Sequence, residues 1–307
     1  MPKFELEIEE ASIDSSLKDD IKAICEYVLE IFAEKISDKT LMEINQLELK
    51  KCIPGEGCPW TNVDALPRCY QIYLSSDWAM KDPVGKNECQ AEEIVYEFSH
   101  EMMRACMFPK DTRLVMPDGS IKYNYNCYSW FIESSCCSIA FICLNEIAKK
   151  WKESPINLKR IYRCPDRKSP DFTQFLQRQM PGLIDSWDQA YTWIESDLSG
   201  LVATKQVRLP GQLICAAAIM QILAEYPGMW GALCELGNVT KVNDIPCKGI
   251  VLNSSIDYNK WRNNVPEEQS PLIDRLEIVF GRYTPSRACQ KVRPSFDILD
   301  QKWRSWP

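Results

Sequence analysis

The segment from Ser129 to Trp151 constrains the fold of this chain more than any other, because it is apolar on most faces of the long helix that it predicts. A helix of this kind has to be surrounded by other elements, so we expect it at the centre of the molecule. A second helix is expected from Glu88 to about Phe108, and its apolar residues form one stripe: Ile94, Val95, Phe98, Met102 and Cys106. We expect these two helices to form a core pair.

The opening third of the chain is expected to mix strands and helices. Phe4, Leu6 and Ile8 alternate with glutamates, which is typical of a half-buried strand. Asp14 or Ser15 then caps a helix that should end near Ile36. Two further strands are expected at 41–49 and 68–75, and Pro54 to Gly57 indicate a loop between them. A small mixed sheet with helices is therefore predicted at the N-terminus.

The remainder of the chain is expected to be mainly helical, after a turn at Pro117–Gly119. The overall class is therefore α+β. Residues 1–151 and 152–307 form two portions, which either fold separately or share one core, and the tail from about 282 shows no periodicity. The helices expected in the second portion are Asp171–Gln179, Ser186–Leu201, Gly211–Tyr226 and Asp274–Phe280.

Composition excludes several classes of function for these 307 residues. A net charge of -7, a pI of about 5.1 and the absence of a long basic run argue against a nucleic-acid partner. No apolar leader or membrane span is recognised, so we expect a soluble cytoplasmic protein without a membrane partner. The fifteen cysteines form no C-x-x-C pair, and most are expected to be reduced, buried thiols.

The residues that indicate chemistry lie on the expected helix pair. His100 is the single histidine of the chain, Glu101 follows it, and Arg104 lies one turn further on, so the pattern reads H-E-x-x-R. In the H-E-x-x-H motif, two histidines one turn apart hold zinc and the glutamate activates a water molecule. The next helix carries Glu133 in the sequence W-F-I-E-S-S, 33 residues after His100.

In motif order this chain resembles the glutamate-type zincin metallopeptidases, over about Phe4 to Asn238. The resemblance implies a zincin-like fold with His100 and Glu133 as zinc ligands and Glu101 as general base. It also implies that the strand through Gln71, Ile72 and Tyr73 lines the substrate cleft and pairs with an extended peptide. The departure from the family is Arg104, which stands at the position of the second histidine ligand.

A guanidinium cannot replace an imidazole as a metal ligand, because it stays protonated and has no lone pair. We expect Arg104 to lie beside Glu101 or to reach Glu133, which would place a fixed cation where the metal stood. No cofactor is then expected. The interpretation that follows is a pseudo-peptidase that binds a peptide or protein partner in the former active-site cleft.

Three alternatives remain open at the level of sequence. Zinc could be held by His100, Glu133 and Cys137, since Cys137 lies one turn after Glu133, and Glu101 would then serve an active metallopeptidase. The two glutamates could instead hydrolyse a substrate without metal, with Tyr128 as an oxyanion donor. The more common role of a loop tyrosine such as Tyr123, Tyr125 or Tyr128 is simply to pack on the protein core. Finally, the H-E match could be accidental in a helical interaction module.

Overall fold

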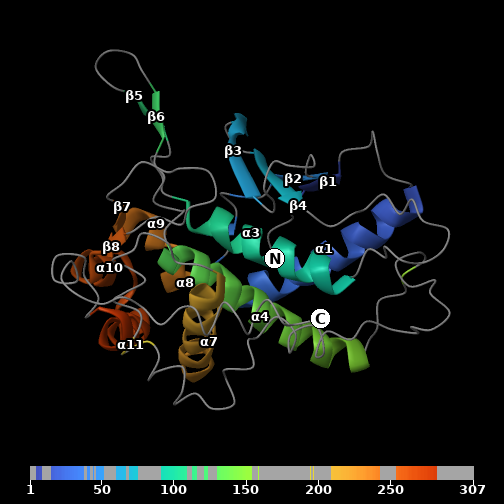
Figure 1. The fold of residues 1–307 in the computed structure, drawn as a ribbon. Coiled ribbons are helices and arrows are strands. Elements are labelled where there is room, and N and C mark those ends of the chain that lie inside the picture. Colours follow the sequence, from blue (N-terminus) through green and yellow to red (C-terminus); the bar gives the residue numbers. More distant parts are fainter. Residues whose placement is uncertain are drawn as a thin grey trace.

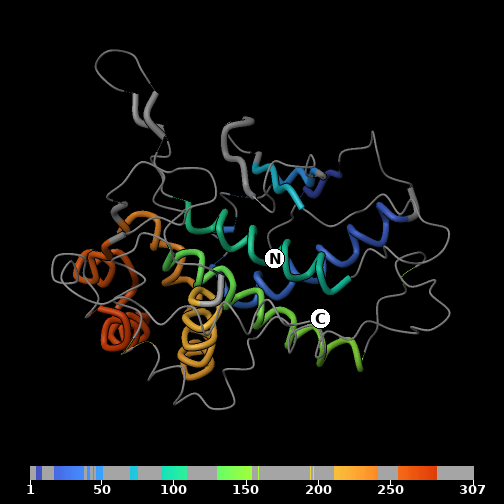
Figure 2. Tube along the Cα trace, in the orientation of Figure 1, coloured from blue at the N-terminus to red at the C-terminus, as the bar shows by residue number. Residues whose placement is uncertain are grey.

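The computed structural model describes residues 5–8, 15–37, 40–41, 44, 46–51, 60–66, 69–74, 91–108, 113–115, 121–123, 130–153, 158, 194, 196, 209–242 and 254–281. Within these residues the chain combines one mixed sheet with a larger number of helices (Figure 1). The predicted α+β class is confirmed at this level. The helices are concentrated in the middle and the second half of the described chain, as Figure 2 shows along the trace.

The main sheet has the strand order β1-β2-β4-β3. The strands are β1 (Glu5–Ile8), β2 (Gln46–Lys51), β3 (Trp60–Leu66) and β4 (Cys69–Leu74). The first three strands in spatial order are parallel, whereas β3 runs antiparallel to β4 at one edge. In β1 the predicted alternation is confirmed, because Leu6 and Ile8 are buried and the glutamates beside them are exposed.

Two helices lie against this sheet and against each other. Helix α1 (Ser15–Lys35) follows the cap region predicted at Asp14 or Ser15, and its periodic apolar residues from Ile21 to Phe32 are buried. Helix α3 (Ala91–Cys106) contacts α1, β3 and β4. Because α3 also contacts α4, it lies between the sheet and the centre of the molecule.

Helix α4 (Trp130–Glu153) occupies the central position that its apolar faces predicted. It packs against α1, α3 and α7 (Leu209–Glu225). By length and composition α4 could cross a membrane, yet 78% of its most apolar window is buried inside the molecule. Ser138 of α4 joins α7 directly, since its Oγ lies 2.7 Å from the carbonyl oxygen of Ala216 and 2.8 Å from that of Ser134.

The described C-terminal part consists of short elements around α11 (Ser270–Phe280). Phe131 of α4 lies edge-on to Phe280, with ring centroids 5.3 Å apart, so the start of α4 packs into this part. Buried residues from β1 to α11 form one continuous hydrophobic cluster. The remaining elements are α8 (Trp230–Leu233), α9 (Leu236–Val239), β7 (Thr240–Val242), β8 (Ser254–Ile256), α10 (Tyr258–Asn264) and the 3₁₀ helix η3 (Glu267–Gln269).

Arg262 connects α10 to α11 near the surface. Its Nε donates to Asp274 Oδ1 at 2.7 Å, its Nη2 pairs with Glu277, and its Nη1 donates to Asn259 Oδ1 at 3.1 Å. About a quarter of the arginine side chain (27%) is exposed. One guanidinium therefore bridges two carboxylates of the same helix face.

Several short elements depart from the sequence prediction. The strand expected at 41–49 begins only at Gln46, because Thr40 and Leu41 are helical. Strand β3 and the three-residue strands β5 (Arg113–Val115) and β6 (Ile121–Tyr123) were not predicted. The seven residues of β3 show no clear alternation, and β5 and β6 are too short to show one. The turn at Pro117–Gly119, the helix at 171–179 and the tail from 282 lie outside the described residues, as does the helix at 186–201 apart from residues 194 and 196.

Candidate functional site

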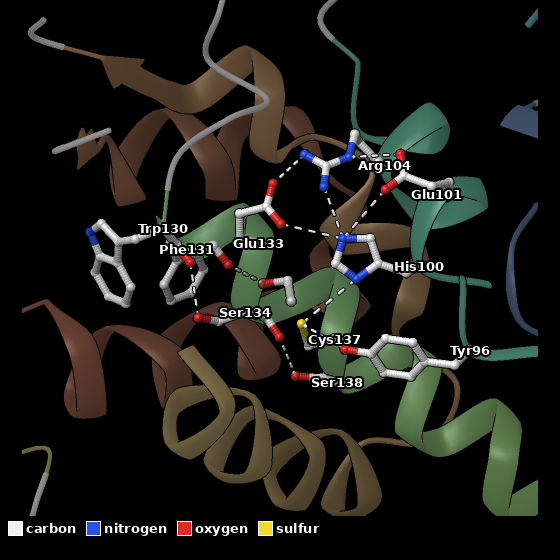
Figure 3. A network of polar contacts seen from close by, with 11 residues as sticks. Tyr96, His100, Glu101, Arg104, Trp130, Phe131, Glu133, Ser134, Cys137 and Ser138 are labelled. Carbon is white, nitrogen blue, oxygen red and sulfur yellow. Dashed lines mark hydrogen bonds and ion pairs between the residues drawn. The ribbon is translucent and has the colours of Figure 1, made fainter. Parts of the chain in front are cut away.

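The two central helices bring all the motif residues into one buried cluster (Figure 3). Helix α3 provides His100, Glu101 and Arg104, and α4 provides Glu133 and Cys137. Residues three or four positions apart share one face of a helix, so each helix presents its members to the other. Because α3 and α4 pack along each other, the two faces meet in the interior of the described structure.

Arg104 connects the two carboxylates of the site. Its Nε donates to Oε2 of Glu101 at 3.0 Å, and its Nη1 donates to Oε1 of Glu133. The side chain of Arg104 is 5% exposed, that of Glu101 is fully buried and that of Glu133 is 15% exposed. Arg104 thus makes both of the contacts that were expected from the sequence, one to Glu101 in its own helix and one to Glu133 on α4.

Arg104 and Glu133 hold each other in the ionised state. Burial raises the pKa of Glu133, but the Arg104 guanidinium and His100 lower it more strongly, to about 2. Burial likewise opposes the charge on Arg104, yet Glu101 and Glu133 raise the pKa of its guanidinium well above the usual value. The arginine and Glu133 therefore form an ion pair at neutral pH, in a place that water barely reaches.

The imidazole of His100 has a different neighbour at each nitrogen. Nε2 lies 2.8 Å from Nη2 of Arg104, 3.3 Å from Oε2 of Glu133 and 3.6 Å from Oε1 of Glu101. Nδ1 lies 3.6 Å from Sγ of Cys137. Burial lowers the pKa of His100, but Cys137, Glu133 and Glu101 together raise it to about 10.

The contacts of Nε2 determine where the ring carries its proton. In the charged ring both nitrogens are donors. Nε2–H then faces Oε2 of Glu133, and the guanidinium of Arg104, which can only donate, has to move back from its 2.8 Å contact with Nε2. When the ring loses a proton, Nε2 is the nitrogen that becomes the acceptor, because the guanidinium of Arg104 can only donate to it. In both arrangements Nδ1 keeps its proton, and that proton faces Sγ of Cys137.

This arrangement does not fit a zinc ion. The guanidinium of Arg104 lies against both Nε2 of His100 and Glu133, where a metal bound to these two residues would need open space. In this geometry the alternative set of His100, Glu133 and Cys137 does not converge on one point, because Glu133 lies at Nε2 and Cys137 at the opposite nitrogen of the ring. Among the described residues no group of three or more His, Cys, Asp or Glu is placed to hold a metal.

The strand expected to receive a peptide has no open edge. Strand β4, which carries Gln71, Ile72 and Tyr73, pairs with β2 on one side and with β3 on the other. Ile72 is fully buried, and Gln71 donates to Glu48 at 2.7 Å. The prediction that a peptide pairs with β4 is therefore wrong, because its backbone groups are already bonded. The described strand that ends the sheet on this side is β3, which contacts α3.

The phenols proposed as oxyanion donors cannot be placed at this site. Tyr125 and Tyr128 lie outside the described residues, and Tyr123 is described only as part of strand β6. The phenol that does reach the site is Tyr96, which the sequence prediction missed. Its hydroxyl donates to Sγ of Cys137 at 3.5 Å. Its position four residues before His100, on the same face of α3, is the signal that could have found it.

A separate pocket of about 430 Å³ lies along the distal half of α4. It is lined by α1, α4, α7 and the first residue of α8, with Lys35 and Lys149 beside Ile142, Met220 and Trp230. None of the residues discussed above lines it, so its contents would not reach His100.

Comparison of the chain with known proteins found no matching family model, no matching curated protein and no matching solved structure. The inference of function therefore depends on the geometry of the site.

Proposed function

We propose that this chain is a degenerate zincin-like metallopeptidase, a pseudo-peptidase in which the guanidinium of Arg104 takes the place of the metal. The observation that carries the proposal is the contact of one arginine with Glu101, Glu133 and His100 at once. These three are the residues that the H-E-x-x-H…E pattern assigns to catalysis and to zinc binding.

Loss of a metal would leave the negative charge of its carboxylate neighbours inside the protein. Two carboxylates buried together without a cation would repel each other, and each would lose its hydration. A guanidinium has the donors to bind both carboxylates at once, and Arg104 reaches them from within the motif itself. The substitution therefore compensates the charge of the site while removing the metal that polarises a peptide bond.

The function we propose for the former cleft is binding of an extended peptide segment of a partner protein. In the described part of the sheet no strand pairs with the outer edge of β3, and this strand contacts the helix that carries His100. An extended peptide can add to such an edge through main-chain hydrogen bonds. We propose a cytoplasmic protein partner rather than a membrane or a nucleic acid, in keeping with the net charge of -7.

The first test is zinc uptake by wild type and by Arg104→His. We expect purified wild type to contain no stoichiometric zinc by elemental analysis and to hydrolyse no peptide. The variant has two imidazoles and Glu133 available, and should bind zinc in isothermal titration calorimetry. Arg104→His combined with Glu133→Gln is the matched control and should bind far less. Stoichiometric zinc in wild type, lost in His100→Gln, would end the proposal.

The second test concerns peptide binding at β3. Peptides selected from a phage-displayed library of unstructured sequences would be titrated against Thr61→Pro and Asn62→Pro, with circular dichroism as the measure of folding. Adjacent residues of a strand point their N–H groups to opposite edges. Proline at the residue that faces outward should abolish binding without loss of folding, whereas proline at the residue bonded to β4 should destabilise the sheet. Selected peptides that bind both folded variants like wild type would contradict the use of this edge.

A further inference from the structure

We propose that Cys137 is a nucleophilic thiol, positioned by His100 and Tyr96 to react with small electrophilic carbon compounds. The inference goes beyond the pseudo-peptidase proposal, because it concerns the Nδ1 side of the imidazole, opposite to Arg104. It would stand or fall whether or not β3 binds a peptide.

The sulfur of Cys137 faces two donors. The hydroxyl of Tyr96 lies 3.5 Å from Sγ, and Nδ1 of His100 lies 3.6 Å from it, with its proton directed at the sulfur in both states of the ring. Two hydrogen bonds donated to one sulfur favour the thiolate, because the charged sulfur is the stronger acceptor. The thiol proton leaves to solvent, and the two donors stabilise the thiolate that remains.

A third group holds the imidazole in place. Oε2 of Glu133 lies 3.3 Å from Nε2, at the far end of the ring from Cys137. Nucleophile, imidazole and carboxylate follow one another in space, which is the order that activated cysteine and serine nucleophiles share. Among the described residues, Arg104 and Glu101 are the other charged groups that contact this end of the ring, and both lie on the Nε2 side.

Cys137 belongs to a small buried hydrophobic cluster. The other members are Phe141 of the same helix and Leu213 and Ala216 of α7. Cys137 is 4% exposed. Only a small reagent is therefore expected to reach the sulfur, which makes iodoacetamide a suitable probe.

The other described cysteines lack this environment, and three of them serve as internal references. Burial raises the pKa of Cys136, which is next in sequence, and also the pKa of Cys143 and of Cys215. None of these three thiols is within hydrogen-bonding distance of an imidazole, since His100 is the only histidine and its Nδ1 faces Cys137. We expect them to be inert for as long as the protein is folded.

The reaction is a simple displacement. The thiolate of Cys137 attacks the methylene carbon of iodoacetamide, so that a sulfur–carbon bond forms as the carbon–iodine bond breaks. Iodide leaves with the bonding electrons. The thiol proton has passed to solvent before the attack, because Nδ1 of His100 already carries a proton and donates it to the sulfur, and no oxidant or further reactant is required.

The experiment is timed alkylation of the full chain at neutral pH, with each cysteine followed by fragmentation mass spectrometry. Cys137 should react about tenfold faster than Cys136, Cys143 and Cys215. His100→Gln should slow Cys137 by about tenfold, and Tyr96→Phe by a smaller factor of about threefold. Cys136→Ala is the matched control and should leave the rate of Cys137 unchanged.

Two outcomes would overturn the proposal. One is a rate for Cys137 no greater than that of Cys136 in the folded protein. The other is an unchanged rate for Cys137 in both His100→Gln and Tyr96→Phe, with circular dichroism as wild type. If His100→Gln unfolds, all buried cysteines react together, and Tyr96→Phe alone then decides the question.

Discussion

Two arginines of this molecule each bridge two carboxylates, and they differ mainly in burial. Arg104 binds Glu101 and Glu133 across the central helix pair with 5% of its side chain exposed. Arg262 binds Asp274 and Glu277 across α10 and α11 with 27% exposed. The hydrogen-bonding groups are alike, but the solvent around them is not.

The comparison separates what a salt bridge contributes from what its absence costs. Near the surface, water replaces a lost partner, so the pair contributes little to stability. In the interior, the remaining charges have neither a partner nor water, and the cost of leaving them there is large. The Arg104 cluster is therefore expected to control the stability of the fold, and the Arg262 cluster to adjust it slightly.

The largest effect is expected from Arg104→Met, which removes the guanidinium that binds both Glu101 and Glu133 and leaves these two carboxylates to share the charge of His100. We expect a loss of about 3–5 kcal/mol in the free energy of unfolding, measured by urea denaturation at neutral pH. Combining this change with Glu101→Gln and Glu133→Gln should restore part of the loss, because no buried charge is then unpaired. A loss below about 1 kcal/mol would mean that the two clusters do not differ.

The next effect concerns acid. The pKa of Glu133 is lowered from 4.5 to about 2, so its ionised form stabilises the folded state. That stabilisation is complete above pH 4.5 and is lost as the pH falls towards 2. Glu133→Gln should therefore flatten the pH dependence of unfolding in this window, while being less stable than wild type at pH 7. Equal acid sensitivity of wild type and variant would contradict the low pKa.

His100 should produce the opposite dependence. Its pKa is raised from 6.5 to about 10, so the charged ring stabilises the folded state below pH 6.5, and this contribution is lost as the pH rises towards 10. Because the chain has one histidine, a single pair of imidazole proton signals reports the titration by NMR. We expect no change in those signals between pH 6 and 8. A midpoint near 6.5 in the folded protein would refute the charged ring.

The smallest effect is expected from Arg262→Ala. The free energy of unfolding should fall by about 0.5–1 kcal/mol, and added salt should reduce the difference further. The changes in unfolding free energy that Glu133 causes in acid and His100 causes in alkali should stay as in wild type, since neither residue lies on α10 or α11. If Arg262→Ala lowered the free energy of unfolding as much as Arg104→Met, burial would not explain the difference expected between the two clusters.

The central helices could be predicted from sequence because their patterns are long and local. The stripe of α3 and the apolar faces of α4 follow from residues within one segment. Strand β3 and the hairpin of β5 and β6 could not be found in this way, because β3 shows no regular alternation and β5 and β6 have only three residues each.

At the site, spacing predicted which residues share a face but not which atoms meet. His100, Arg104, Glu133 and Cys137 do lie together, as one helical turn between partners suggests. Helical spacing cannot say which nitrogen of the imidazole turns towards Cys137. That choice follows from how α3 packs on α4, and it separates a metal-ligand set from a thiol–imidazole pair.

The hydroxyl of Ser138 has a mechanical consequence for the neighbouring thiol. It bonds to the backbone of α7 at Ala216, the residue that also packs against Cys137. A slide of α7 along α4 would have to break this bond inside the core, where no water replaces it. The bond therefore opposes a shift of α7 along α4 next to the sulfur, although the hydroxyl also has the carbonyl oxygen of Ser134 as an acceptor in its own helix.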